Sequence, residues 1–365
     1  MNILLVANEL RYTCGVTNHL LHLSKGLSQR LSNDPSNKIF ILCGGGKGIE
    51  RFSDINTEII NNEKFLHEKR NPINYLLAVR FLKSFASEKK IDIIHSHTHY
   101  AANIAARAFK TGNKIKTIQT NHGLLEQKGR LKHFNADKYI AINEHIYEYI
   151  IKNNIAVQEN IKLIRCGIPV PDIPPQKNNK KLKVIAASRF IREKGLDTYI
   201  NAVSLLDERL KQKAEFFIAG EGELEKELKK QNKDKNAGIT FLGSIKDLYP
   251  VLAETDALVF PSRSKTEGFP AVITEAGANN TLVITSDFSS LGNIIENNQD
   301  GIIFKQNNYE QLSLLLTKFI ENREEYVSIA LKFYKKTKKL FTIDEMIDKH
   351  LKLYNEVLKA RCQNR

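Results

Sequence analysis

The sequence lacks the features that mark a membrane-spanning or secreted chain. No apolar run approaches the ~18 residues that a membrane span requires. The opening stretch MNILLVANE enters an apolar strand without a basic n-region or a cleavage site. We therefore expect a cytoplasmic protein, at most peripheral at the inner face of a membrane.

Signatures of several common sites are missing as well. The four cysteines (Cys14, Cys43, Cys166 and Cys362) show no CxxC spacing, which argues against a zinc site or a disulfide framework. Neither GxGxxG nor GxxxxGK(S/T) occurs, which argues against a dinucleotide site and a Walker site. No Asp-x-Asp triplet occurs either. We expect neither a resident metal nor a cofactor.

Acidic residues are outnumbered. Lys and Arg number 55 and Asp and Glu 41, so the formal net charge is +14. Such an excess suits nucleic acid, an anionic membrane surface or a phosphorylated substrate. The aromatic residues do not alternate with the basic clusters, and no zinc-finger or RRM string occurs. We therefore expect no nucleic-acid partner.

What is present is a repeated alternation of strands and helices. A length of 365 residues suits two cores better than one. Short apolar runs alternate with helical patterns in both halves, which predicts two doubly wound α/β domains with a cleft between them. The expected strands are Ile3–Ala7, Ile39–Cys43, Ile91–His95, Lys116–Gln119, Tyr139–Ile142, Val184–Ala187, Phe216–Ala219, Ile239–Phe241, Ala257–Phe260, Leu282–Thr285 and Gly301–Phe304.

Composition sets the expected boundaries. Four prolines follow Gly167 in the stretch GIPVPDIPPQKNNKK, which is typical of a stiff linker. We expect one domain at 1–168, a linker at 169–181 and a second domain at 182–341. A C-terminal helix at about 342–365 should pack back on the first domain.

Two carboxylates follow the strand expected at Ala257–Phe260. Gly268 and Pro270 break the chain, which puts Glu267 on a loop and Glu275, eight residues later, inside a helix. Open α/β sheets bind ligands beyond the carboxyl ends of their strands, and a helix N-terminus favours an anion there. A strand, loop and helix with two solvated glutamates would give the same spacing.

Other polar groups also follow expected strands. Gly15 precedes the first helix, where its backbone can approach a ligand closely, although an ordinary turn would look the same. Arg189 and Lys194 could neutralise a diphosphate, although exposed basic residues are usually only solvated. His122 could reach a ligand or simply bond a nearby carbonyl.

Three histidines, His95, His97 and His99, occupy alternate positions. Alternate residues of a strand share a face, so three imidazoles could ligate a metal. The strand should end near His95, and no acidic cluster lies nearby in the sequence. We therefore interpret these residues as part of the wall of a cleft.

The string EGFPAVITEA, residues 267–276, resembles the Glu-x7-Glu signature of family 4 retaining glycosyltransferases, which depend on nucleotide sugars and have the GT-B fold. GVTNHLLHLSKGL, TNHG, RFIREKG, FFIAGEGELEKEL and FLGS are similar to further segments of that family. The resemblance implies metal-independent transfer of a sugar from a nucleoside diphosphate sugar, with UDP-sugar favoured, to an acceptor hydroxyl. It also implies a place in cell-envelope glycan or glycolipid assembly.

The resemblance also implies roles for individual residues. The family's catalytic positions correspond to His122 near the transferred sugar, Arg189 and Lys194 on the donor diphosphate, and Glu267 on the sugar. Its substrate-binding positions correspond to Gly15, Val16, Gly220, Leu242, Gly268, Phe269, Ala271, Val272 and Glu275. Among these, Glu275 would hold the donor ribose, and Leu242 lies in the segment that meets the nucleobase.

Three positions depart from the family pattern. Cys14 replaces the first of two glycines before the first helix. The chain reads NNTL after Ala278, where the family commonly has a glycine and a proline, and Asn293 replaces a usual glutamate. The departures after Ala278 and at Asn293 put the choice of donor in question and leave room for a weakly active or inactive relative.

Two other functions fit the residues. A sugar-nucleotide epimerase would share the phosphate-binding loops but would need no acceptor, and a non-catalytic basic protein would bind nucleic acid in a salt-sensitive way. For a transferase, the acceptor would be a glycan or a lipid-linked sugar. Apolar and basic residues mix in the helix expected at Tyr75–Lys90, so we expect this helix to rest on an anionic membrane surface. A helix whose apolar residues pack on the sheet and whose lysines are only solvated would show the same mixture.

Overall fold

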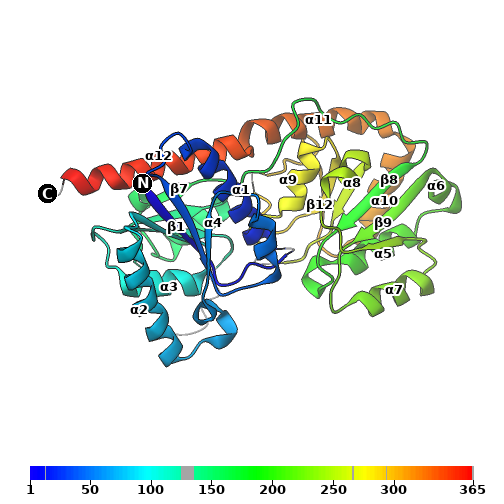
Figure 1. Cartoon of the computed structure of the whole chain (residues 1–365). Helices are drawn as coiled ribbons and strands as arrows, with labels where there is room; N and C mark the ends of the chain where they lie inside the picture. The colour runs from blue at the N-terminus through cyan, green and yellow to red at the C-terminus, as the bar shows by residue number, and fades with distance from the viewer. Residues whose placement is uncertain (13, 125–134, 265–266, 293, 364–365) are drawn as a thin grey trace. The chain divides into compact units, whose positions relative to one another are not determined.

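The computed structural model describes residues 1–12, 14–124, 135–264, 267–292 and 294–363. These residues fold into two α/β units (Figure 1). One unit comprises Met1–Gly167 together with Ile343–Arg365, and the other comprises Ile168–Thr342. Each unit is built on one parallel sheet.

The first unit contains a seven-stranded sheet in the order β3-β2-β1-β4-β5-β6-β7. Its strands are β1 (Asn2–Val6), β2 (Lys38–Cys43), β3 (Glu58–Asn61), β4 (Ile93–Ser96), β5 (Lys116–Asn121), β6 (Lys138–Ala141) and β7 (Ile161–Leu163). Its α-helices are α1 (Gly15–Leu31), α2 (Pro72–Glu88), α3 (His99–Ala108), α4 (Glu144–Lys152) and α12 (Ile343–Gln363). The strand order reverses between β1 and β4, so their carboxyl ends form a switch point where such sheets bind ligands.

Both faces of this sheet are buried. Along β1, Ile3 and Leu5 pack with residues of α1 and α12, whereas Leu4 and Val6 pack with residues of α2 and α3. These four helices are labelled in Figure 1. Successive side chains of a strand point to opposite faces, so an uninterrupted apolar run is what a doubly covered strand requires.

The second unit contains a six-stranded sheet in the order β10-β9-β8-β11-β12-β13. Its strands are β8 (Leu182–Ala187), β9 (Ala214–Ala219), β10 (Thr240–Gly243), β11 (Ala257–Phe260), β12 (Leu282–Ser286) and β13 (Ile302–Phe304). Its α-helices are α5 (Leu196–Ser204), α6 (Glu208–Lys213), α7 (Glu225–Asp234), α8 (Tyr249–Glu254), α9 (Ala271–Ala278), α10 (Tyr309–Glu321) and α11 (Arg323–Leu340). The switch point lies between β8 and β11.

The fold class expected from the sequence is confirmed, and each expected strand overlaps an observed one. Two strands, β3 and β7, were not expected. Both lie at the edges of the first sheet, and only one of their residues, Ile161, is fully buried. An edge strand with little burial needs no long apolar run, so its sequence gives little signal.

The segment expected to be a linker, 169–181, lies within the second unit. The hydroxyl of Tyr334 donates to the carbonyl of Pro171 at 2.6 Å, and Lys177 Nζ donates to the carbonyls of Leu252 and Asn279, each at 3.0 Å. Prolines cannot donate to a sheet, but their carbonyls still accept, so the segment is tied to the unit without forming a strand.

The model gives no candidate for a membrane-spanning helix within its described residues, because none combines sufficient length with sufficient apolar character.

Candidate functional site

The loops that follow β8 and β11 bring a cation and a carboxylate together. Lys194 Nζ lies 2.6 Å from Glu267 Oε2, and the two side chains are only 13% and 12% exposed. Ser262 Oγ donates to the same carboxylate oxygen at 3.1 Å. Lys194 and Glu267 were both predicted from the sequence as catalytic, and the structure places their side chains in direct contact.

Two glycines allow neighbouring loops at this edge of the second sheet to approach one another: Gly195 brings the loop after β8 close to that after β11, and Gly220 brings the loop after β9 close to that after β8. Gly195 has φ +66°, and a Cβ there would lie 2.1 Å from the carbonyl oxygen of Pro261. Gly220 has φ +133°, and a Cβ there would lie 1.9 Å from the carbonyl oxygen of Ser188. Only glycine fits such contacts. Gly220 therefore has a structural reason to be glycine, independent of any ligand.

Helix α9 begins at the same edge of the sheet. Pro270 precedes its first residue, and Ala271 and Val272 in its first turn are half-buried. Glu275 lies one turn further on, also half-buried. Burial, with a smaller contribution from the Glu275 carboxylate, raises the pKa of Tyr249. The first-turn amides of α9 and the Glu275 carboxylate thus lie on one short helix.

The remaining predicted residues of the second unit are more open. Arg189 follows β8 and is exposed, and Leu242 on the edge strand β10 is 40% exposed. Gly268 and Phe269 are half-buried between Glu267 and α9. An exposed arginine on the loop that also carries Lys194 remains available for an anionic ligand.

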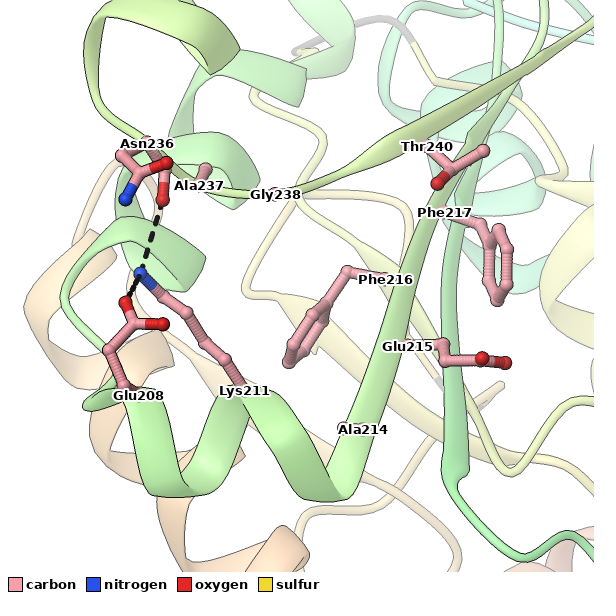
Figure 2. Close-up of a pocket in the computed structure, with 10 residues that line it drawn as sticks. All are labelled: Glu208, Lys211, Ala214, Glu215, Phe216, Phe217, Asn236, Ala237, Gly238 and Thr240. Carbon is pink, nitrogen blue, oxygen red and sulfur yellow. Dashed lines mark hydrogen bonds and ion pairs between the residues drawn. The ribbon is translucent and has the colours of Figure 1, made fainter.

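Two cavities lie at opposite edges of the second sheet. One, of about 470 Å³, is lined by Ser264, Asp287, Ser289, Lys305 and Gln306, which follow the carboxyl ends of β11, β12 and β13. The other, of about 310 Å³, lies at the amino ends of β9 and β10, where Lys211 bonds Glu208 and the carbonyl of Asn236 (Figure 2). Only the first shares the carboxyl edge with Lys194 and Glu267, so we exclude the second from the candidate site.

In the first unit, three histidines converge at the carboxyl ends of the strands. His19 comes from α1, His97 follows β4 and His122 follows β5. His97 Nδ1 lies 3.2 Å from His122 Nε2, and the rings of His19 and His122 meet edge to face with centroids 4.7 Å apart. His122 was predicted from the sequence, whereas His19 was not.

Two further imidazoles adjoin this group. His95 lies between the Tyr354 hydroxyl and Thr120 Oγ1, with both contacts at 2.7 Å. His350 on α12 donates from Nδ1 to the carbonyl of Met346 at 2.8 Å. Burial lowers the pKa of His19, His95 and His97 well below the ordinary value, that of His122 to about 3 and that of His350 to about 4. The cluster is therefore neutral at pH 7.

The alternation of His95, His97 and His99 does not place all three on one strand. Strand β4 ends at Ser96, and His99 is the first residue of α3. The sequence did carry a signal for His19, which lies four residues after Gly15 on one helix face.

Two predicted residues lie at the start of α1. Gly15 is its first residue, is exposed, and has nothing within 4 Å of an added Cβ, and Val16 beside it is half-buried.

One departure from the family pattern preserves the local backbone. Asn280 follows α9 with φ +52°, a left-handed conformation that asparagine adopts more readily than most residues. Thr281 Oγ1 donates to the carbonyl of Leu252 at 2.9 Å, which ties the next residue down. Of the other departures, Cys14 directly precedes α1 and is half-buried, and Asn293 lies outside the described residues.

Two parallel α/β units, each with a switch point at the carboxyl edge of its sheet, are the architecture of GT-B glycosyltransferases. Residues 13–170 match the family described as Glycosyltransferase Family 4, and residues 172–338 match that described as Glycosyl transferases group 1. The chain belongs to glycosyltransferase family 4 and is a glycosyltransferase.

Several individual proteins are similar to this chain in sequence or in structure. An uncharacterised glycosyltransferase of Methanocaldococcus jannaschii is 28% identical over 73% of this chain and 76% of its own length. The N,N'-diacetylbacillosaminyl-diphospho-undecaprenol alpha-1,3-N-acetylgalactosaminyltransferase of Campylobacter jejuni is 23% identical over 89% and 93%. The crystal structure of Anabaena HepE in complex with UDP-glucose superposes with a TM-score of 0.78 at 18% identity, covering 99% of this chain and 100% of that one.

The histidine cluster predicts acid sensitivity. The unfolded chain protonates its histidines near pH 6.5, whereas the folded cluster does so only at lower pH, so below pH 6.5 the unfolded state binds more protons. The stabilisation is complete above pH 6.5 and is lost as the pH falls, by up to about 1.4 kcal/mol per pH unit for each buried imidazole. The melting temperature should fall as the pH is lowered from 6.5 to 5, which is above the pH at which most carboxylates titrate.

The matched variant is His350→Gln, which removes one buried imidazole and should make the pH dependence shallower. A melting temperature that stays constant from pH 7 to pH 5 would contradict the prediction.

Proposed function

We propose that this protein is a retaining glycosyltransferase that moves a sugar from a UDP-sugar to an acceptor hydroxyl during assembly of a surface polysaccharide or lipid-linked glycan. The observation that carries the proposal is the Lys194–Glu267 pair at the carboxyl edge of the second sheet. Two similar proteins support it. The Campylobacter jejuni relative is named for a sugar transfer to an undecaprenol-linked acceptor, and Anabaena HepE binds UDP-glucose.

The proposed roles of the cations follow from where negative charge develops during sugar transfer. As the glycosidic bond of the donor breaks, negative charge collects on the departing diphosphate. In our proposal, Lys194, Arg189 and the first-turn amides of α9 around Ala271 and Val272 stabilise that charge in place of a metal ion. Because Lys194 is only 13% exposed, its attraction to phosphate is screened less than that of a surface lysine.

The carboxylate partner has a second role. While no donor is present, Lys194 and Glu267 neutralise one another. A donor phosphate would share Lys194, and Glu267 with Gly268 and Phe269 would then hold the hydroxyls of the sugar. We assign the donor ribose to Glu275, the nucleobase to the segment around Leu242 and the phosphate-facing backbone to Gly220.

The first unit contributes the other residues of the proposal. We assign His122 to the transferred sugar, where an imidazole that is neutral at pH 7 can donate one hydrogen bond and accept another. Gly15 and Val16 at the start of α1 provide exposed or half-buried backbone amides that favour an anion.

The direct test is turnover. The protein should release UDP from one member of a panel of UDP-sugars only when an acceptor, such as an undecaprenol-linked sugar, is present, and the product should retain the anomeric configuration of the donor. Conversion of the donor in the absence of acceptor would identify an epimerase instead. Absence of any donor-dependent reaction across the panel would refute the proposal.

Loss of either cation should impair transfer. Arg189→Ala and Lys194→Ala should each lower kcat/KM by about 100-fold or more, because each removes stabilisation of the leaving group. Arg192→Ala is the matched control, since Arg192 is an exposed arginine on the same loop that the proposal does not use. Calorimetry with UDP should show weaker binding in the first two variants, and near-normal turnover in either would place the diphosphate elsewhere.

The helix expected at a membrane surface is α2. Its inward face (Ala78, Val79, Leu82, Phe85 and Ala86) packs on the sheet, as any helix of this fold must. Ile73 and Leu76, however, are 71% and 59% exposed, and Arg80 and Lys83 beside them are exposed too. Exposed apolar residues among cations suit the headgroup region of an anionic leaflet, so we propose that α2 rests there and meets a lipid-linked acceptor.

Sedimentation with vesicles tests this placement. The protein should bind phosphatidylglycerol vesicles but not phosphatidylcholine vesicles, and high salt should release it, because screening weakens attraction between exposed charges. Leu76→Ser should weaken binding, whereas Leu314→Ser, which changes an exposed leucine of α10, should not. Protein that stays in the supernatant with anionic vesicles at low salt would favour a soluble acceptor.

A further inference from the structure

The histidine cluster of the first unit contains a set of nitrogens placed for a metal ion. One ring nitrogen from each of His19, His97 and His122 lies within 4.8 Å of the others. A zinc ion bound at ~2.0–2.1 Å holds its tetrahedral ligands about 3.4 Å apart. The 3.2 Å between His97 Nδ1 and His122 Nε2 is already close to that spacing.

The same rings carry unsatisfied polar atoms. Within the described residues, neither ring nitrogen of His19 has a hydrogen-bond partner, and Nε2 of His97 has none. His19 and His97 are 3% and 2% exposed. A buried polar atom without a partner destabilises the fold. A metal ion bound to one ring nitrogen of His19 would supply an interaction that this ring lacks, whereas on His97 the ion would use Nδ1 rather than Nε2.

We propose that His19, His97 and His122 form a binding site for a divalent transition-metal ion of the zinc type. Neutral imidazoles suit zinc, copper and nickel, whereas magnesium, calcium and manganese prefer carboxylate and carbonyl oxygens. The three-residue group contains no carboxylate. The site would therefore select zinc over the ions that usually accompany a sugar diphosphate.

The proton balance of binding is simple. At pH 7 each imidazole is neutral and carries one N–H. An ion between His97 Nδ1 and His122 Nε2 would replace the hydrogen bond that these atoms now share. The N–H of each ring then resides on the other nitrogen, so the three ligands need not release a proton.

Neighbouring groups hold the ligands in position. The ring of His95, fixed between Tyr354 and Thr120, lies with its centroid 4.1 Å from that of His97. The ring centroid of His350 lies 6.0 Å from that of His19. Its Nδ1 donates to a carbonyl, and its Nε2 has no hydrogen-bond partner among the residues that the structure describes. With three ligands, one coordination position would stay open for water or another oxygen.

The sequence predicts no metal, because it contains no Asp-x-Asp triplet, no acidic cluster lies near the histidines, and the strand carrying His95, His97 and His99 should end near His95. The site proposed here uses a different set, assembled from α1 and two strand ends. If His122 also meets the transferred sugar, an inference that rests on the proposed function, bound zinc would slow transfer, and chelation would not reduce it.

Metal binding by the full-length protein tests the site. After stripping with a chelator, the protein should take up one zinc ion per chain in equilibrium dialysis. Cobalt(II) should give the intense visible absorption of a tetrahedral site, and X-ray absorption should show nitrogen ligands at ~2.0 Å. His19→Gln and His97→Gln should each lower zinc affinity by at least about 100-fold. His67→Gln, which removes an exposed imidazole, should leave it unchanged.

Two results would overturn the site. Zinc binding that is equal in wild type, His19→Gln and His97→Gln would place the ion elsewhere. Octahedral oxygen ligation of cobalt in the wild-type protein would exclude the histidine set, even if a variant failed to fold. Neither result bears on the transferase, because its turnover is measured on the metal-stripped protein.

Discussion

Burial of both sheet faces constrains where this chain can place polar side chains. Side chains along β1 and β8 point into one helical layer or the other, and nearly all are apolar. A polar group there would need a partner inside the core. The ends of the strands are therefore where reactive groups accumulate, and Lys194, Glu267, His97 and His122 all follow carboxyl ends.

The two units place different chemistry at that edge. The second unit holds a cation and a carboxylate in contact, which suits a ligand with both phosphate charge and hydroxyls. The first holds neutral imidazoles in a largely dehydrated cluster, which suits a neutral group or a metal ion rather than phosphate.

The sequence predicted the inner strands because apolar runs follow directly from double burial. It missed β3 and β7, in which only Ile161 is buried, because strands with so few buried residues show little apolar pattern. It predicted Glu267, Lys194 and His122 from motifs that are contiguous in sequence. It could not predict the contact of His19 with His122, or of His95 with Tyr354, because residues from distant segments meet only through the three-dimensional packing.

Helix α12 determines when the first unit can complete its core during synthesis. Helix α12 completes the core beneath α1 with Met346, Ile347 and Tyr354. The Tyr354 hydroxyl is also one of the two hydrogen-bond partners of His95. The residues of α12 leave the ribosome after the entire second unit. During synthesis, the first unit must therefore wait with one apolar layer uncovered until α12 has emerged, so a ribosome that stalled before Ile343 would leave a nascent chain prone to aggregation.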